Sequence, residues 1–128
     1  MDWNLKIGMI GKKSETVTPN TLASTYGSGG VDVYSTPAMI GLLEGAALSG
    51  VDPYLPEGHV TVGVHLDVAH LGATLPGLKV EAEAKLIEIK GRKLVFKVEA
   101  RDENKVIGKG THTRAIVELE SFLKQIGL

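Results

Sequence analysis

One segment near the middle of the chain is typical of a helix that has no polar face. Ser35 and Thr36 supply hydroxyl groups and Pro37 follows them, which is the pattern that begins a helix, and Gly50 is suited to ending it. The residues between are alanine, methionine, isoleucine, leucine and glycine, with a single glutamate and a final serine. Because no side of such a helix favours water, we expect about residues 37–49 to form a central buried helix.

The chain after this helix changes to an alternation with a period of two, which is typical of strands. Between Val60 and Leu71 the even-numbered residues are apolar up to His70, so we predict one apolar face that ends in a histidine. Three further strands are predicted at about residues 78–89, 94–100 and 106–117. In the first of these the apolar positions change parity at Ile87, which predicts a β-bulge.

The two ends of the chain add short elements. A strand is expected over residues 5–17, bulged at Gly11, and a hydroxyl cap followed by proline predicts a short helix over residues 18–26. The three glycines of residues 27–30 then favour a loop. The helical spacing of apolar side chains in residues 119–126 predicts a short C-terminal helix.

This order of elements predicts a single α+β domain over residues 1–128. We expect an antiparallel sheet of about five strands wrapped around the central helix. Gly41 and Gly45 share one face of that helix and would let the sheet approach closely. A single curved sheet leaves its edge strands unpaired, so we expect two copies of the chain to pair edge to edge as a homodimer.

Composition argues against several classes of function. The net charge of −1 gives no basic field for nucleic acid, and no apolar run reaches the roughly 20 residues of a membrane span. The sequence contains no cysteine, which removes disulfides, thiolate catalysis and cysteine-type zinc sites. The first residues do not read as a signal peptide. We therefore expect a cytoplasmic protein without a metal or a cofactor.

Glu44 is the only charged residue of the predicted central helix. A carboxylate at this position must be paired, desolvated or at an opening, because an unpaired buried charge is strongly destabilising. Two interpretations stay open. Glu44 is either a structural carboxylate with a fixed partner, or a base or nucleophile in a cleft.

His70 and Thr36 are the candidates to act with Glu44. His70 ends a strand face that should pack on the helix, either as a satisfied core residue or as an acid–base partner of the glutamate. The Thr36 hydroxyl either caps the helix or faces a developing oxyanion. Eight residues separate Thr36 from Glu44, roughly 12 Å along a straight helix, so the substrate, a helix break or a second protomer must bridge them.

Three other features of the strands have functional interpretations. His65 and Asp67 lie two residues apart, and two such ligands are weak evidence for a metal, so we interpret them as a solvated face. Gly108 and Gly110 share a face and would clear space for a ligand or for the helix. Arg114 has the parity of the core face and needs a partner, which is the helix glutamate, another acid, or a ligand carbonyl or phosphate.

Three segments resemble the hotdog thioesterases related to fluoroacetyl-coenzyme A thioesterase. They are YGSGGVDVYSTPAMIGLLEGAAL, GVHLDVAHLGATLPGLKV and GRKLVFKVEARDENKVIGKGTHTRAIV, and the similarity covers about residues 7–118. Its specific parts are the stretch from STP to the glutamate, the HLxxxH strand and the GTHxR strand. The resemblance implies a hotdog fold, a dimer of hotdogs, and hydrolysis of an acyl-CoA thioester to a free acid and coenzyme A.

The resemblance also assigns roles to residues. In that family a threonine, a glutamate and a histidine act together, and a glycine and an arginine line the substrate site; the matching positions are Thr36, Glu44, His70, Gly63 and Arg114. The implied mechanism is attack on the thioester by Glu44 or by water that it activates, with His70 moving protons and Thr36 or backbone amides stabilising the oxyanion. Glycines and a serine replace the aromatic lid of the fluoroacetyl-specific enzyme, so we expect a general acyl-CoA thioesterase.

Two other functions on the same fold stay open at this point. A hotdog hydratase or dehydratase usually carries a histidine and an aspartate or asparagine on its central helix, where this chain has Glu44 alone. A non-catalytic module that binds an acyl-CoA is the second alternative. Such a module would keep its ligand after replacement of Glu44 and His70 and would have no activity to lose.

Overall fold

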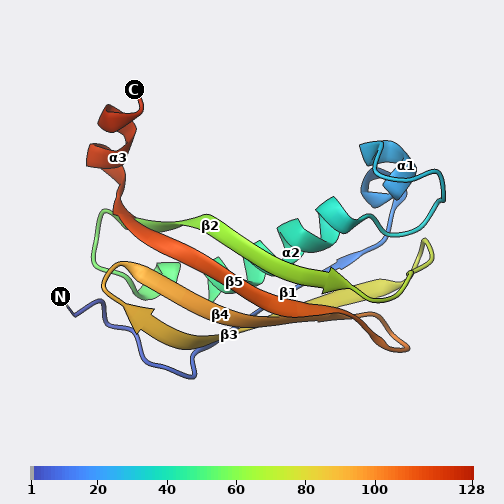
Figure 1. Ribbon diagram of the computed structural model, residues 1–128, viewed down its shortest axis with the longest axis horizontal. Coiled ribbons are helices and arrows are strands. Elements are labelled where there is room, and N and C mark those ends of the chain that lie inside the picture. The colour runs from blue at the N-terminus through green and yellow to red at the C-terminus, as the bar shows by residue number, and fades with distance from the viewer. Residues whose placement is uncertain (1) are drawn as a thin grey trace.

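The computed structural model describes residues 2–128, which form a five-stranded antiparallel sheet that curls around one long helix (Figure 1). The helix is α2, Thr36–Ser49. The order of strands across the sheet is β1-β3-β4-β5-β2. The strands are β1 Ile10–Thr16, β2 His59–His70, β3 Lys79–Lys90, β4 Lys93–Arg101 and β5 Val106–Glu118. The predicted α+β layout is confirmed.

Short helices connect or follow these elements; they are η1 Pro19–Thr21, α1 Ala23–Tyr26, η2 Asp52–Tyr54 and α3 Leu119–Gln125. The helix predicted from Thr18 is capped by that residue as expected, but it divides at Leu22. Leu22 has an extended backbone and forms a β-bridge with Tyr34, which is incompatible with a continuous helix. The C-terminal helix is confirmed as α3.

Helix α2 packs on the concave face of the sheet, chiefly against β1, β3 and β4. Its buried side chains meet the inward-facing residues of the strands to form one core; these include Met39, Leu43, Ala46, Val80, Leu86, Leu94 and Phe96. The expectation of burial on every side is wrong for one stripe of the helix. Thr36, Gly41 and Leu48 are exposed, and Glu44 is partly so, because the edge strand β2 makes little contact with the helix.

Glycines decide how closely the sheet approaches the helix. A Cβ atom at Gly11 would lie 2.7 Å from the backbone nitrogen of Gly50, so Gly11 is a close contact with the helix end and not a bulge as expected. At Gly45 the side chain of Lys13 from β1 occupies the space, which agrees with the predicted close approach. Nothing lies within 4 Å of a Cβ at Gly41, so the expectation for Gly41 is wrong.

Two bulges set which side chains face inward. The predicted bulge in β3 is confirmed by a register shift between Leu86 and Glu88. A second shift, between Gly63 and His65 in β2, was not expected from the sequence. The shift leaves Val64 51% exposed and reverses which side chains of the preceding residues face the core. Thr61 is therefore buried, whereas its apolar neighbours Val60 and Val62 are only partly so. The predicted apolar face of β2 is therefore wrong ahead of the bulge.

Strand β2 lies at one edge of the sheet and leaves a row of backbone groups without a strand partner among residues 2–128. The C-terminal end of β2, the first turn of α2 and helix α1 lie at the same end of the molecule (Figure 1). No helix within residues 2–128 is long and apolar enough to cross a membrane. The cytoplasmic location stays a prediction.

Candidate active site

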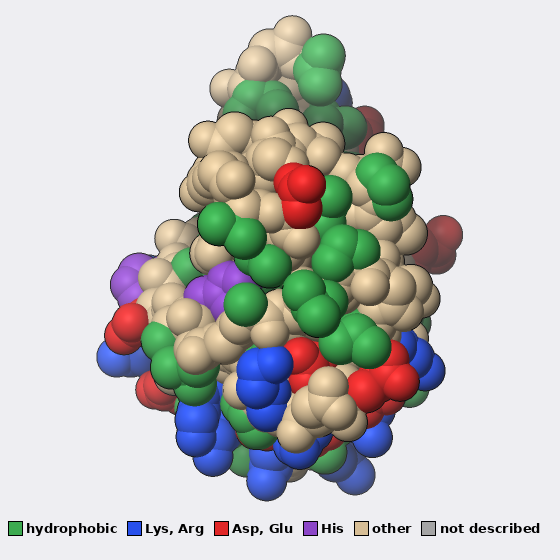
Figure 2. Space-filling model, turned by 90° about the vertical axis from the view of Figure 1, so that its right-hand side faces the viewer, with side chains coloured by type: hydrophobic (Ala, Val, Ile, Leu, Met, Phe, Trp, Pro, Cys, Tyr) green, Lys and Arg blue, Asp and Glu red, His purple; other side chains and the backbone are tan. Residues whose placement is uncertain are grey.

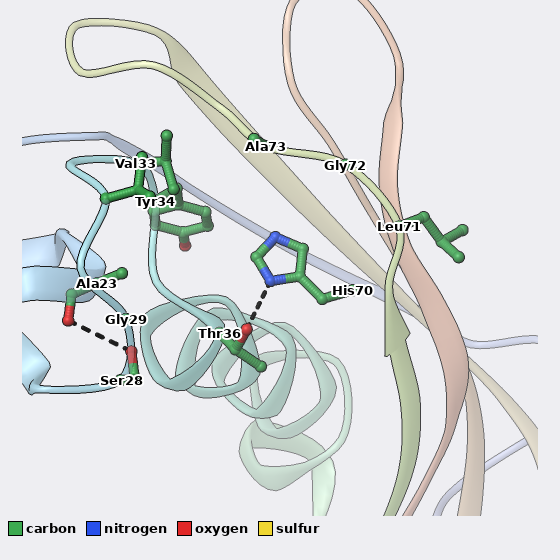
Figure 3. Close-up of a pocket in the computed structure, with 11 residues that line it drawn as sticks. Ala23, Ser28, Gly29, Val33, Tyr34, Thr36, His70, Leu71, Gly72 and Ala73 are labelled. Atoms are coloured by element: carbon green, nitrogen blue, oxygen red, sulfur yellow. Dashed lines mark hydrogen bonds between the residues drawn. The ribbon is translucent and has the colours of Figure 1, made fainter.

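The Thr36 hydroxyl lies 2.7 Å from Nδ1 of His70, which is hydrogen-bonding distance (Figure 3). Thr36 begins α2, and His70 is the last residue of β2, so the fold joins two positions that are 34 residues apart. A hydroxyl in contact with an imidazole is the geometry in which a base removes a proton from an oxygen nucleophile.

The hydroxyl of Thr36 is free for this contact because another residue caps the helix. Ser35 is the N-cap, and its side-chain oxygen accepts a hydrogen bond from the amide of Ala38 at 3.1 Å. Pro37 has no amide hydrogen to satisfy. The alternative in which Thr36 caps the helix is therefore wrong, and its exposed side chain turns toward His70 instead.

His70 has one ring nitrogen that is buried without a hydrogen-bond partner in the described part of the chain, the Nε2 atom. Burial lowers the pKa of His70 from its ordinary value, and the backbone of Gly72 opposes that shift only in part. The imidazole is consequently neutral at neutral pH. In that state it can accept a proton at Nδ1.

A cavity of about 480 Å³ adjoins the contact between Thr36 and His70. Its other walls come from α1, from the loop between α1 and α2, and from the segment 71–73 after β2 (Figure 3). The second nitrogen of the His70 ring points away from Thr36, toward the side chain of Tyr34 and the backbone of Ala73 (Figure 3). The candidate base therefore stands at the wall of a cavity that is open to solvent.

Glu44 lies elsewhere along α2 and is paired with Arg114. The Oε2 atom of Glu44 is 3.7 Å from Nη1 of Arg114, and the two side chains are 37% and 5% exposed. A Cβ atom at Gly63 would lie 2.7 Å from the same Glu44 oxygen. Gly63 and Arg114, the two predicted substrate-site residues, thus both adjoin Glu44, and the carboxylate is both paired and at an opening.

Three other hydrogen bonds fix the Arg114 guanidinium. Its Nε and Nη2 atoms donate to the hydroxyl and the carbonyl of Thr61, at 2.8 and 3.0 Å, and Nη1 donates to Nε2 of His112 at 3.1 Å. Thr61 in turn donates its hydroxyl proton to Asp52 at 2.5 Å. Burial lowers the pKa of Arg114, while the carboxylates of Asp52 and Glu44 oppose the shift and keep the side chain cationic.

The tautomer of His112 follows from these partners. Arginine has no acceptor atom, so Nε2 of His112 accepts, and Nδ1 donates to the carbonyl of His65 at 2.8 Å. Burial is the main reason that the pKa of His112 is lowered, and the neighbouring Arg114 cation adds to the effect. His112 and Asp52 were not predicted as site residues. The parity that His112 shares with Arg114 on β5 was a usable signal, whereas Asp52 follows α2 in a connection that has no pattern.

The pair formed by Thr36 and His70 does not meet the pair formed by Glu44 and Arg114 within one protomer. Helix α2 is continuous from Thr36 to Ser49, so Thr36 and Glu44 stay roughly 12 Å apart along its axis. The ionic partner of Glu44 in the described chain is Arg114, and the hydrogen-bond partner of His70 is Thr36. Direct contact between Glu44 and His70, an option that the sequence left open, is not formed.

Three of the other candidates, His65, Asp67 and Gly108, lie where the structure of the described residues gives them no role in a ligand or metal site. His65 and Asp67 are exposed, as a solvated face requires, and residues 2–128 contain no cluster of three or more potential metal ligands. A Cβ atom at Gly108 would lie 2.6 Å from the Met39 sulfur, so this glycine clears space for α2. The helix, not a ligand, is the neighbour that requires Gly108.

The chain is similar to proteins of one family over most of its length. Residues 17–120 match the family model described as fluoroacetyl-CoA-specific thioesterase, FlK. The fluoroacetyl-CoA thioesterase of Streptantibioticus cattleyicolor is 42% identical over 91 residues, which are 71% of this chain and 66% of that protein. The match therefore spans just under two thirds of the relative's own length.

Solved structures give the same result for the fold. A structure of the fluoroacetyl-CoA thioesterase FlK has a TM-score of 0.88 and 33% identity, with 95% of each chain covered. A threonine-to-serine variant of FlK in complex with acetyl-CoA has a TM-score of 0.89 and 31% identity, covering 95% of this chain and 96% of that one. A hot-dog-like protein from Thermanaerovibrio acidaminovorans, at 23% identity, has a TM-score of 0.89 over 98% of this chain and 95% of that one. The predicted hotdog fold is confirmed.

Proposed function

The chain belongs to the fluoroacetyl-CoA-specific thioesterase family, and from that membership we propose that it hydrolyses acyl-CoA thioesters at the site formed by Thr36 and His70. The observation that carries this proposal is the 2.7 Å contact between the threonine hydroxyl and the imidazole at the wall of a cavity. A neutral histidine next to a hydroxyl supplies the base that attack on a thioester requires.

The reaction begins with a proton transfer to Nδ1 of His70 from the Thr36 hydroxyl or from a water molecule that is hydrogen-bonded beside it. The oxygen that loses this proton bonds to the thioester carbonyl carbon, and the carbonyl oxygen takes the negative charge. When the intermediate collapses, the carbon–sulfur bond breaks and His70 returns the proton to the coenzyme A thiolate. If Thr36 is the nucleophile, water releases the acid from its ester in a second cycle of the same transfers.

Glu44 completes the site from a second copy of the chain. Within one protomer it stands roughly 12 Å along the helix from Thr36, so it does not reach a thioester held by the Thr36 and His70 pair. Its side chain is 37% exposed and lies on the stripe of α2 that the sheet leaves open. In a dimer paired along the β2 edge, this stripe faces the same stripe of the partner. Glu44 then orients water or attacks as the carboxylate of the composite site.

Arg114 and Gly63 keep this carboxylate usable. The guanidinium of Arg114 is fixed by hydrogen bonds with Thr61 and His112. A cation that cannot move in this way holds the Glu44 carboxylate in one position. The absence of a side chain at Gly63 leaves the Glu44 oxygen uncovered. These residues therefore act on the position of the carboxylate, in addition to lining the substrate site as the family resemblance implies.

The proposal is tested by release of free thiol from a panel of acyl-CoA esters that runs from acetyl to decanoyl and includes aromatic acids. We expect turnover of at least one ester, and a loss of about 100-fold or more in kcat for His70→Ala and for Glu44→Gln. Glu88→Gln is the matched control for Glu44→Gln, because its side chain is exposed on β3, away from the β2 edge and from the site.

Two results would contradict the proposal. Absence of turnover on every ester of the panel would favour the non-catalytic binding module. Full activity in both His70→Ala and Glu44→Gln would mean that the protein is a thioesterase but that these two residues do not form its active site.

A further inference from the structure

The cavity beside His70 is much larger than a fluoroacetyl group, the acyl group that gives the relatives their name. Its volume is about 480 Å³, and a two-carbon acyl group would fill roughly 100 Å³ of it if each heavy atom takes the space of a water molecule, about 30 Å³. Cavities of a few hundred Å³ usually hold much larger ligands. No bulky side chain divides the space, because Ser28 and Gly29 stand where the loop between α1 and α2 lines it.

Apart from those of the catalytic pair and of Ser28 and Tyr34, the side chains that line the cavity are apolar. Alanine, valine, leucine and glycine provide most of the lining, namely Ala23, Gly29, Val31, Val33, Leu71 and Ala73. Val31 is 65% and Leu71 56% exposed, which places apolar side chains at the opening. The end of the molecule that carries these loops shows a gathering of hydrophobic side chains, with Lys and Arg concentrated below them (Figure 2).

The polar side chains of the lining are already bonded to the protein. The hydroxyl of Ser28 donates to the carbonyl of Ala23 (Figure 3), and the hydroxyl of Tyr34 donates to Glu15. Burial is the main reason that the pKa of Tyr34 is raised above its ordinary value, so the phenol stays neutral. None of the eleven lining residues, all in the described part of the chain, is Lys, Arg, Asp or Glu.

These walls discriminate between the parts of an acyl-CoA. The pantetheine arm carries two amide groups, and it would exchange hydrogen bonds to water here for a lining whose Ser28 and Tyr34 hydroxyls are already bonded to the protein. A dicarboxylic acyl group would carry its free carboxylate into a space whose lining has no cationic side chain. The ammonium of Lys105 lies behind this wall, where it already donates to the carbonyl of Ala73 at 2.8 Å and pairs with Asp102 at 3.0 Å. An alkyl or aryl chain loses nothing on entering and gains from the removal of its surface from water.

On the basis of the thioesterase function proposed above, we propose that the cavity lined by Gly29, Val31 and Ala73 holds the acyl chain, and that the preferred substrates are apolar medium-chain or aryl thioesters. The thioester carbonyl lies at Thr36 and His70, and the chain extends into the cavity. Each methylene buried there raises kcat/KM about threefold until the cavity is full.

The first experiment compares kcat/KM for acetyl-, hexanoyl-, octanoyl- and glutaryl-CoA. We expect octanoyl-CoA to exceed acetyl-CoA by about 30-fold or more, and hexanoyl-CoA to exceed glutaryl-CoA by about tenfold or more. A value for acetyl- or fluoroacetyl-CoA equal to that for octanoyl-CoA overturns the inference and leaves the thioesterase function standing.

Variants that fill the cavity locate the chain. A Cβ atom at Gly29 meets only the Ala23 methyl group, at 3.4 Å, so a side chain at this position can start from the backbone as it stands. We expect Gly29→Leu and Ala73→Leu each to lower the ratio of kcat/KM for octanoyl-CoA to kcat/KM for acetyl-CoA about tenfold or more. Gly30→Leu is the matched control, because Gly30 belongs to the same loop, has no atom within 4 Å of a Cβ and does not line the cavity. An equal loss for every ester overturns the inference and assigns the cavity to pantetheine.

Binding separates this inference from the proposed reaction. Calorimetry with the non-hydrolysable thioethers S-octyl-CoA and S-ethyl-CoA measures the chain preference without any turnover. A dissociation constant at least about tenfold lower for the octyl compound supports the inference even if no ester is cleaved, a result that would overturn the proposed function alone. Equal dissociation constants overturn the inference.

Discussion

At the scale of single residues, this chain places ionisable side chains where burial changes their behaviour. His70 and His112 are both held neutral by desolvation, but only His70 has a ring nitrogen without a partner in the described chain. His112 is bonded at both nitrogens, to His65 and to Arg114. Because Nδ1 of His70 contacts the Thr36 hydroxyl, His70 is placed to move a proton, whereas His112 supports the guanidinium of Arg114.

The pH dependence of turnover follows from His70. Its pKa lies below the ordinary histidine value of 6.5, and only the neutral ring accepts the first proton. We expect kcat/KM to rise with pH and to reach a plateau with an apparent pKa below 6.5, measured with any ester that is turned over. An acid limb with an apparent pKa above 6.5 would contradict the role of His70.

Glu44 and Arg114 are expected to differ in their effect on folding. Arg114→Lys removes three directed hydrogen bonds from a buried site, and we expect the free energy of unfolding to fall by about 3 kcal/mol. Glu44→Gln should change it by less than about 1 kcal/mol, because that carboxylate is 37% exposed and solvent screens the pair. Urea unfolding of both variants measures this, and an equal loss of stability would contradict the buried network.

Asp102 provides a test away from the site. Its buried carboxylate accepts hydrogen bonds from Thr74 and Lys105 in the loops near the cavity. Burial alone would raise the pKa of Asp102, but hydrogen bonds from Asn104, Lys105 and Thr74 outweigh it and lower the value to about 2. A lowered carboxyl pKa stabilises the fold above the unfolded value of 3.8, and this contribution is lost as pH falls toward 2.

Replacement of Asp102 by asparagine should therefore cost about 2 kcal/mol at pH 7. The difference between wild type and variant should shrink below pH 4, which urea unfolding at several pH values measures. Asp67→Asn is the matched control, because Asp67 is exposed on β2. A constant difference between pH 7 and pH 3 would contradict the origin of the effect in the Asp102 charge.

At the scale of elements, the position of α2 over the sheet decides where the functional side chains lie. Its first turn is fixed by the Ser35 cap and by the hydrogen bond from the Tyr34 amide to the Thr74 carbonyl. Its last turn meets β1 at Gly11, where no side chain intervenes. The helix is thus held at both ends, with Thr36 facing β2 at one end.

Two glycine-to-alanine variants should have opposite effects on stability. Gly11→Ala puts a methyl group 2.7 Å from the nitrogen of Gly50 and against the Ala46 carbonyl, which should cost about 2 kcal/mol or more. Gly41→Ala adds a methyl group with nothing within 4 Å in its own protomer, in the interior of a helix, and should stabilise the protomer by about 0.5–1 kcal/mol. Thermal unfolding of both variants measures the difference, and destabilisation of similar size in the two would contradict the described packing.

At the scale of the whole molecule, one protomer holds the two parts of the proposed active site apart from each other. The Thr36 and His70 pair adjoins the cavity, Glu44 stands two turns along the same helix, and β2 is an open edge beside both. An isologous dimer along that edge would cover the edge and the exposed stripe of α2 together. The proposed homodimer therefore belongs to the catalytic argument as well as to the stability of the fold.

Light scattering should give a mass close to twice the 13.6 kDa of one chain. Subunit mixing tests the composite site more directly. Co-expression of Thr36→Ala with Glu44→Gln creates dimers in which one site keeps both native residues, and random pairing should restore about one quarter of wild-type activity. Each variant expressed alone is the control. No recovery in verified mixed dimers would mean that Thr36 and Glu44 of the same protomer act together.

The sequence was sufficient to predict α2, the strands β2 to β5 and α3, because their signals lie within a few neighbouring residues. It was wrong about the first strand, which was expected over residues 5–17 and is Ile10–Thr16, and it did not predict η2. The Ser-Thr-Pro start, the apolar helix and the period of two gave α2 and the strands, and the parity change at Ile87 gave one bulge. The bulge at Val64 was not predicted, because apolar residues continue to alternate with the others through this part of the sequence. The residue types of the site were also evident, as a lone glutamate, a terminal histidine and an inward arginine.

Only the tertiary structure decided which of these residues meet. A hydrogen bond or an ion pair between distant positions depends on bulges, caps and the lateral position of a helix, and none of these is encoded by local periodicity. The sequence thus identified Thr36, Glu44 and His70 as candidates, and the fold joined Thr36 to His70 and Glu44 to Arg114. The reason is geometric, since a continuous helix keeps its own residues apart and lets other elements supply their partners.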